Sequence, residues 1–157
     1  MATRPDRIVV PAHPDHIFYL ANHMAEDDCR ECEAGGFGPY RALKDSLDMS
    51  VAAWTGMVGD MPVVMFGVTP WNGILSGKGS PWLLGTDELK NHKIYFLKRN
   101  REFLEKMQVL FPELSGVVDI RHRRGIRWLR WLGFTVGPDI LGLGPCAMPF
   151  YRFHKGT

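Results

Sequence analysis

The sequence lacks the features that mark secreted or membrane-spanning proteins. It has three cysteines in 157 residues, an odd number that is too small for a disulfide framework. No window holds the ~18 uninterrupted apolar residues that a membrane span requires. The opening residues, MATRPDRIVV, lack the apolar core and small-residue cleavage site of a signal peptide. We therefore expect a cytoplasmic protein with free thiols.

Charge and length exclude further classes. A formal net charge of +2 gives little sequence-independent attraction to a polyanion, so nucleic acid is not expected as a partner. The apolar fraction of 45% and the charged fraction of 23% are those of a globular protein. The length suits one core and is short for two ordinary domains. We expect a single domain over residues 1–157.

The most informative stretch is residues 117–134, VVDIRHRRGIRWLRWLGF. Its first residues are β-prone, and residues 121–125 form a charged turn. Apolar side chains then recur at helical spacing as far as Gly133, a residue type that commonly ends a helix. The segment therefore predicts a strand, a basic turn and an amphipathic helix that ends at Gly133-Phe134.

Periodicity and breaker residues predict alternating strands and helices in the rest of the chain. Residues 26–33, which contain five carboxylates, are interpreted as a loop or a solvated helix end, and residues 71–79 as a loop. Pro81 confines its strand to an edge, a bulge or a strand start. Strands are expected at residues 8–10, 51–58, 62–68, 80–86, 117–120 and 145–153, and helices at 14–24, 40–47, from Thr86 or Asn91 to Leu110, and at 126–132.

This element order and the Gly-Phe segment resemble the GCN5-related N-acetyltransferase (GNAT) fold. The wording VVMFGV at 63–68, GSPWLLGT at 79–86 and IRWLRWLGF at 126–134 is also similar to a phage and prophage family of GNAT-like proteins related to internal virion protein A of short-tailed phages. The resemblance implies an α/β (α+β) domain with a mixed, mostly antiparallel sheet, helices on both faces, and splayed fourth and fifth strands. It also implies that the protein is located in the bacterial host cytoplasm, or that it associates with virion proteins.

The GNAT resemblance implies a site for acetyl-CoA or another acyl-CoA between the splayed strands. The pantetheine would pair with the backbone of the fourth strand, at Trp82, Leu83 and Leu84. The glycine-rich turn that usually binds the pyrophosphate in this fold is missing, and Gly85 is the one glycine directly after the strand. A degenerate pyrophosphate site is therefore expected.

The start of the long helix decides what replaces that turn. If Asn91 is the N-cap, His92 and Lys93 lie in the first turn, where a bound phosphate would offset their charge. If Thr86 is the N-cap, the two carboxylates after it complement the helix dipole and His92 is a surface residue. We favour Thr86, because Thr-Asp-Glu is the stronger helix-start signal.

Two further positions of the GNAT pattern fall on this chain. The asparagine after the fifth strand falls on His122, which would act as a general base or bind phosphate beside the cleft. An exposed loop histidine is the alternative, and we favour it. The tyrosine that often protonates the departing thiolate falls on Leu129, which cannot donate a proton. Its absence lowers the efficiency of transfer without abolishing it, since a thiolate is a tolerable leaving group.

Charged and thiol clusters offer other sites. Arg127 and four further arginines within residues 121–130 could hold a coenzyme phosphate. Alternatively they form a solvated helix face paired with residues 26–33, and we favour this alternative. The acidic segment at residues 26–33 could attract a cationic amine acceptor. Alternatively it is only a solvated helix end, and we favour this second interpretation. Cys29 and Cys32 lie one helical turn apart without a second ligand pair, so no metal site is expected.

Two functions remain open. One is an acyl-CoA-dependent N-acyltransferase, in which an amine attacks a thioester held at the fourth strand. The other is a catalytically inactive GNAT-fold protein in virion assembly, and the missing turn and Leu129 favour it. The cleft strands and His122 favour the enzyme. Nucleic-acid binding through Arg121–Trp131 is a third and weaker hypothesis, because packing on the sheet explains the tryptophans.

Overall fold

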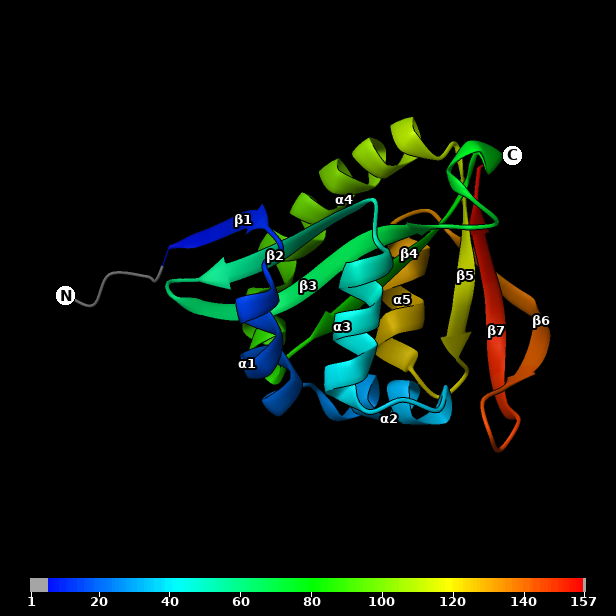
Figure 1. Ribbon diagram of the computed structural model, residues 1–157, viewed down its shortest axis with the longest axis horizontal. Coiled ribbons are helices and arrows are strands. Elements are labelled where there is room, and N and C mark those ends of the chain that lie inside the picture. Colours follow the sequence, from blue (N-terminus) through cyan, green and yellow to red (C-terminus); the bar gives the residue numbers. More distant parts are fainter. Residues whose placement is uncertain (1–5, 157) are drawn as a thin grey trace.

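The computed structural model describes residues 6–156, and within them a single seven-stranded sheet runs through the protein. Its strand order is β1-β2-β3-β4-β5-β7-β6. Neighbouring strands are antiparallel except β4 and β5, which are parallel. Figure 1 shows α1 and α3 in front of the sheet and α4 and α5 behind it. The predicted single α+β domain, with a mixed sheet covered on both faces, is confirmed.

Short 3-10 turns (η) separate several of the main elements. In chain order the elements are β1 (Arg7–Pro11), η1 (Pro14–His16), α1 (Ile17–Asn22), α2 (Glu26–Ala34), α3 (Pro39–Met49), β2 (Ala52–Val58), β3 (Met61–Pro70), η2 (Ile74–Ser76), β4 (Lys78–Gly85), η3 (Asp87–His92), α4 (Lys93–Leu110), β5 (Glu113–Asp119), α5 (Arg123–Trp131), β6 (Thr135–Leu143) and β7 (Met148–Lys155). None of the helices in residues 6–156 is long and apolar enough to cross a membrane.

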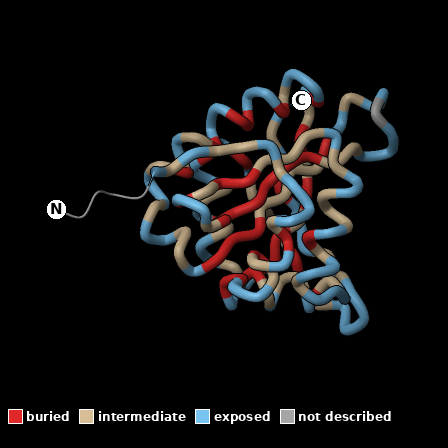
Figure 2. The backbone as a smooth tube through the Cα atoms, turned by 60° about the vertical axis from the view of Figure 1, so that its left-hand side comes forward, coloured by how far each residue is buried: buried red, intermediate tan, exposed pale blue. Residues whose placement is uncertain are grey.

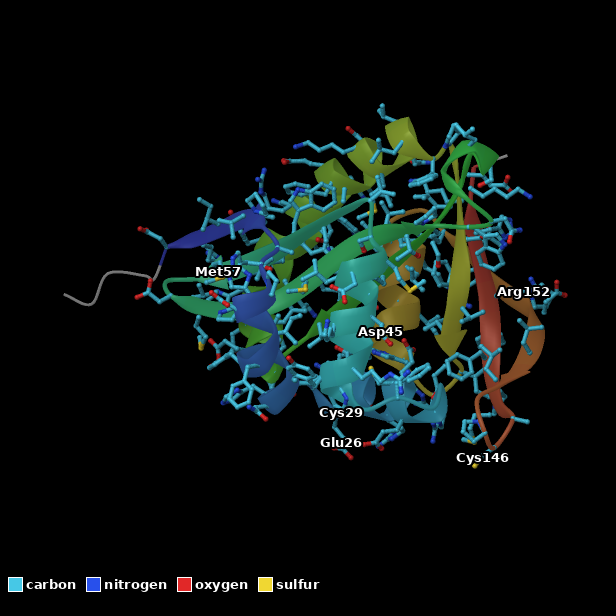
Figure 3. All side chains as sticks on the ribbon, in the orientation of Figure 1. Glu26, Cys29, Asp45, Met57, Cys146 and Arg152 are labelled. Carbon is cyan, nitrogen blue, oxygen red and sulfur yellow. The ribbon has the colours of Figure 1, made fainter. Side chains whose placement is uncertain are left out.

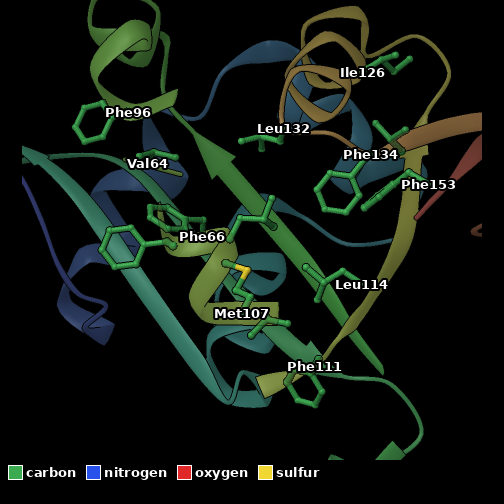
Figure 4. Packing of buried hydrophobic residues seen from close by; sticks show 14 of the residues in the cluster. Val64, Phe66, Phe96, Met107, Phe111, Leu114, Ile126, Leu132, Phe134 and Phe153 are labelled. Carbon is green, nitrogen blue, oxygen red and sulfur yellow. The ribbon is translucent and has the colours of Figure 1, made fainter. Parts of the chain in front are cut away.

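Two apolar clusters pack on opposite faces of the sheet. Strand β3 contributes to both, because its run of apolar residues is buried on either side, as expected for a central strand. Figure 2 shows this burial as red segments along the central strands. The smaller cluster lies under α1 and α3 and includes Leu20, Leu43, Met65 and Leu84. The larger lies under α4 and α5 and includes Phe66, Phe96, Met107, Phe134 and Phe153 (Figure 4).

Strands β6 and β7 and helix α2 differ from the sequence predictions. Strand β6 was not predicted, because Gly137, Pro138 and Gly142 resemble loop residues. In the structure the register of β6 against β7 shifts between Val136 and Ile140, and this irregularity accommodates the breakers. The last strand, predicted at 145–153, spans Met148–Lys155. The acidic residues 26–33, interpreted as a loop or helix end, form their own helix α2.

The start of the long helix also differs from both alternatives. Thr86 precedes the 3-10 turn η3, but its hydroxyl donates to the carbonyl of Val63 and does not cap a helix. The α-helix itself begins at Lys93, with His92 at the N-cap position. Thr86 is buried under β3, and this contact outweighs its local capping preference.

Gly56 on β2 provides a test of this packing. A Cβ there would lie 2.5 Å from Phe96 and 2.7 Å from Val64, both of which are fully buried. We expect Gly56→Ala to lower the free energy of unfolding by about 1–3 kcal/mol, because the core has no room to relax. Urea unfolding measures the change.

Gly38→Ser is the matched control. A Cβ at Gly38 meets no atom within 4 Å, and the residue is the N-cap of α3, where serine is favoured. We expect this variant to equal or exceed the wild-type stability. Equal stability of Gly56→Ala and wild type would contradict the packing at β2.

Candidate active site

Strands β4 and β5 pair at one end and then separate. Their parallel register joins Lys78 with Glu113 and Gly79 with Leu114, and no further pair follows in the described chain. Figure 1 shows the two strands diverging from this end towards α2. We call the space between residues 80–85 and 115–119 the β4–β5 wedge. The splayed fourth and fifth strands predicted from the sequence are therefore present.

Helix α2 closes the open end of the wedge with its own polar groups. The carboxylate of Asp28 accepts a hydrogen bond from the backbone N–H of Gly85 at 2.9 Å. Glu31 accepts one from the backbone N–H of Asp119 at 3.0 Å. In addition, the N–H of Ala25 donates to the carbonyl of Gly85 at 2.9 Å. Backbone groups that would have met a strand partner are thus satisfied by α2.

The exposed edge of β4 follows from the same contacts. The N–H and C=O of Gly85 point away from β3, towards α2. Because backbone directions alternate along a strand, those of Leu83 and Pro81 point into the wedge as well. Pro81 has no N–H to leave unpaired there, which explains how a proline sits within an interior strand. The backbone N–H and C=O of Leu83 therefore point into the wedge, where β5 offers no strand partner along residues 6–156.

A cavity of about 650 Å³ occupies the wedge. Its walls come from α2 and α3 on one face of the sheet and from α4 and α5 on the other, so it passes through the sheet between β4 and β5. The polar groups of the wall are concentrated at the α2 end and at the openings, whereas the wall along α4 is mostly apolar. The volume lies within the range of ordinary small-molecule sites.

His122 lies at the junction of β5 and α5 with both ring nitrogens engaged. Nδ1 accepts the N–H of Gly125 at 2.9 Å, which caps α5. Nε2 lies 2.5 Å from Asp28 Oδ1, so the neutral ring carries its proton on Nε2. Burial by itself disfavours the imidazolium, but the hydrogen bond to Asp28 and its charge outweigh burial and raise the pKa of His122. His122 is therefore a partly buried residue with both ring nitrogens fixed, and not an exposed loop histidine.

Glu31 is the second titratable group in the cavity wall. Removal from water raises the pKa of its carboxyl to about 7, although the positive charge on His122 and the Asp119 N–H act in the opposite direction. A carboxyl that titrates near neutral pH can accept a proton from an ammonium group. Its neighbour Cys32 is unsuited to nucleophilic work, because burial raises the pKa of its thiol to about 12.

Four exposed cations of η3, α4 and α5 line the cavity, and we call them the basic rim: Lys90, Lys93, Arg124 and Arg127. Arg124 lies 3.7 Å from Asp27 of α2, so the rim begins where the acidic helix ends. Asn91 and His92 do not join the rim, since both side chains turn to Glu88. Of the residues 91–93 predicted to bind phosphate, Lys93 lines the cavity.

The structure brings most of the predicted site residues to one cavity. Trp82, Leu83, Leu84, Thr86, Lys93, His122 and Arg127 line it, and Gly85 closes it through its backbone. Leu129, at the position of the expected acid, lines the same cavity.

Sequence reasoning missed Asp28 and Glu31 as individual site residues. Their signal was the three-residue spacing, which places both on one face of a helix. Glu26 lies off that face and points away from the protein (Figure 3).

Comparison with solved structures identifies the fold. An acetyltransferase of the GNAT family from Bacillus anthracis has a TM-score of 0.71 at 8% identity, covering 98% of this chain and 96% of that chain. Spermidine N-acetyltransferase from Vibrio cholerae, in complex with CoA and spermine, has 0.70 at 6% identity, covering 96% and 95%. Ribosomal-protein-alanine N-acetyltransferase from Brucella melitensis has 0.68 at 9% identity, covering 96% and 99%.

These similarities confirm the GNAT fold predicted from the sequence. Identities this low establish the fold alone. No protein-family model and no curated protein matches the sequence. The similarity to the phage and prophage proteins therefore stays a prediction.

The raised pKa of Glu31 has a consequence for stability. A carboxyl whose pKa is raised on folding favours the folded state while it is protonated, and this contribution disappears as pH rises from about 4.5 through about 7. We expect Glu31→Gln, which cannot ionise, to gain stability over wild type by on the order of 1–2 kcal/mol between about pH 5 and about pH 7.5. Urea unfolding at both pH values measures the difference.

Glu33→Gln is the control, because it removes the same charge from an exposed position on α2. The free energy of unfolding of this variant should depend on pH as that of the wild type does. A constant difference between Glu31→Gln and wild type across the pH range would show that Glu31 ionises freely in the folded protein.

Proposed function

We propose that residues 1–157 form an acyl-CoA-dependent N-acyltransferase. The observation that carries this proposal is the β4–β5 wedge, a cavity whose wall is formed by elements on both faces of the sheet. Two substrates can enter such a cavity from opposite sides and meet in its centre. The fold similarity to the Vibrio cholerae enzyme, whose structure is in complex with CoA and spermine, supports the proposal.

The residues present fit an acyl-CoA. The unpaired backbone N–H and C=O of Leu83 match the amide groups of a pantetheine arm. The basic rim supplies charge for the phosphates in place of a glycine-rich turn, through Lys90, Lys93 and Arg127. Bound acyl-CoA supplies an acyl carbon attached to a thiolate leaving group.

The α2 side fits a cationic amine acceptor. Asp27, Asp28 and Glu31 line the cavity there and would attract an ammonium group, which first loses one proton to Glu31. The amine nitrogen then bonds to the acyl carbon while the C–S bond breaks and its electron pair leaves with sulfur. The second amine proton goes to the departing thiolate through solvent, because Leu129 cannot donate one.

His122 takes a positioning role in this proposal instead of the general-base role expected from the sequence. Both ring nitrogens are already engaged, one by the cap of α5 and one by Asp28. A base must have a free lone pair for the incoming proton. We assign that role to Glu31, whose Oε2 accepts the Asp119 N–H.

Coenzyme A binding tests the proposal directly. We expect titration calorimetry with free CoA to give a micromolar Kd, and Lys93→Ala and Arg127→Ala each to weaken binding about 5- to 30-fold, through loss of a charge-assisted contact of about 1–2 kcal/mol. Arg130→Ala is the control, because Arg130 is an exposed arginine of α5 outside the cavity wall.

The opposite outcome has a defined meaning. Absence of binding at millimolar CoA would reject the transferase proposal. The remaining hypothesis would then be the catalytically inactive virion protein that the phage resemblance implies. If CoA binds, we propose that the enzyme acts in the bacterial host cytoplasm.

A further inference from the structure

A second cavity, of about 400 Å³, adjoins the β4–β5 wedge, and Val117 lines both. Val118 and Phe153 belong to the apolar cluster under α4 and α5. Because side chains alternate along a strand, their chain neighbours Val117 and Arg152 point to the opposite face. Figure 1 shows β5 and β7 uncovered on that face above α2. The second cavity therefore lies next to the proposed acceptor side of the wedge.

The wall of the second cavity carries one free charge of each sign. Lys78 and Glu113 line it as an ion pair at 3.9 Å. Arg152 and Asp139 also line it and are exposed, and neither forms an ion pair with any of residues 6–156. Both charges are thus available to a ligand.

The strand register places these two charges side by side. Residues 137–139 of β6 lie in the irregular stretch opposite Arg152 of β7, so Asp139 and Arg152 are on strands about 5 Å apart. Ser115 and His154, which are direct partners across β5 and β7, add a hydroxyl and an imidazole to the same wall. A cation and an anion presented together match the carboxylate and the ammonium of a free α-amino acid.

The register also gives the distance from Arg152 to Glu31, the proposed base in the wedge. Glu31 accepts the N–H of Asp119 at 3.0 Å, and Asp119 is two residues, or about 7 Å, from Val117. Val117 is the partner of Arg152, on a strand about 5 Å away. The Glu31 carboxylate and the Arg152 backbone are therefore on the order of 10 Å apart.

A free diamino acid has the length that this distance requires. In extended lysine the side-chain nitrogen is about 6 Å from the α-carbon, and a hydrogen bond at each end adds about 3 Å. The flexible side chain of Arg152 takes up the remaining difference. An α-amine with its own carboxylate is too short to contact both Glu31 and Arg152.

We propose that the acyl acceptor is a free diamino acid of the lysine class, acylated on its side-chain amine. That amine gives its proton to Glu31, while the α-carboxylate binds Arg152 and the α-ammonium binds Asp139. A lysine within a polypeptide has neither free end group and does not match the second cavity. This inference rests on the proposed transferase function.

Three matched amines test it: L-lysine, 1,5-diaminopentane, which lacks the carboxylate, and 6-aminohexanoate, which lacks the α-ammonium. With acetyl-CoA as donor, we expect kcat/KM of the wild type to be about tenfold higher for lysine than for either analogue, through one more charge-assisted contact. Mass spectrometry should locate the acetyl group on the side-chain nitrogen.

Two variants assign the contacts. Arg152→Gln should lower kcat/KM about tenfold for lysine and 6-aminohexanoate and leave 1,5-diaminopentane unchanged. Asp139→Asn should lower it for lysine and 1,5-diaminopentane and leave 6-aminohexanoate unchanged. Arg130→Gln is the control, because Arg130 is exposed and outside both cavity walls. All three variants should keep the wild-type thermal unfolding temperature, since the positions are exposed.

The outcomes separate this inference from the proposed function. Equal kcat/KM for the three amines, or an equal loss for all three in Arg152→Gln, would overturn the diamino acid while the transferase stands. A protein that binds CoA and acetylates none of the three amines would overturn it as well. Failure of free CoA to bind would instead reject the transferase.

Discussion

The separation of β4 from β5 depends on the carboxylate of Asp28. One oxygen accepts the N–H of Gly85 at the end of β4, and the other accepts from His122 at the end of β5. Glu31, one turn further along α2, does the same for the N–H of Asp119. Without these acceptors, the buried N–H groups of Gly85 and Asp119 would each cost about 1–3 kcal/mol, which would favour pairing of the two strands along their full length. Helix α2 therefore replaces a strand as the partner at this end of the sheet, and the cavity follows from that replacement.

The same arrangement changes what β4 can contain. By strand order it is an interior strand, where proline is normally excluded. Beyond Gly79, however, its second side faces a cavity, so Pro81 loses no ladder hydrogen bond there. Leu83 keeps both backbone groups directed at the same space. A strand that is interior at one end and an edge at the other can hold an extended ligand by backbone pairing, which is how peptide-like chains add to sheets.

The sequence predicted the parts of this structure that local patterns encode. The apolar run of β3, the amphipathic helix ending at Gly133 and the β-prone end of β5 all carry strong periodicity or punctuation. Helix α2 was hidden, because its inward face is made of Asp28, Glu31 and Cys32 in place of an apolar stripe. The contact of Asp28 with His122 joins residues 94 positions apart, and no local pattern reports such a pair. His122 was found through resemblance, and the structure adds the partners of both ring nitrogens, from which we propose a positioning role.

A net charge of +2 conceals a strong separation of charge across the cavity. The acidic side chains of the wall come from α2, and the basic rim comes from η3, α4 and α5. In the proposed transferase, an anionic donor and a cationic acceptor would each be attracted to a different side and repelled from the other, at the low effective dielectric of a partly enclosed site. The side from which each substrate of the proposed transferase approaches would then follow from the charge distribution alone. Ionisation of Glu31 near neutral pH adds to this, because the α2 side of the cavity then carries a further negative charge.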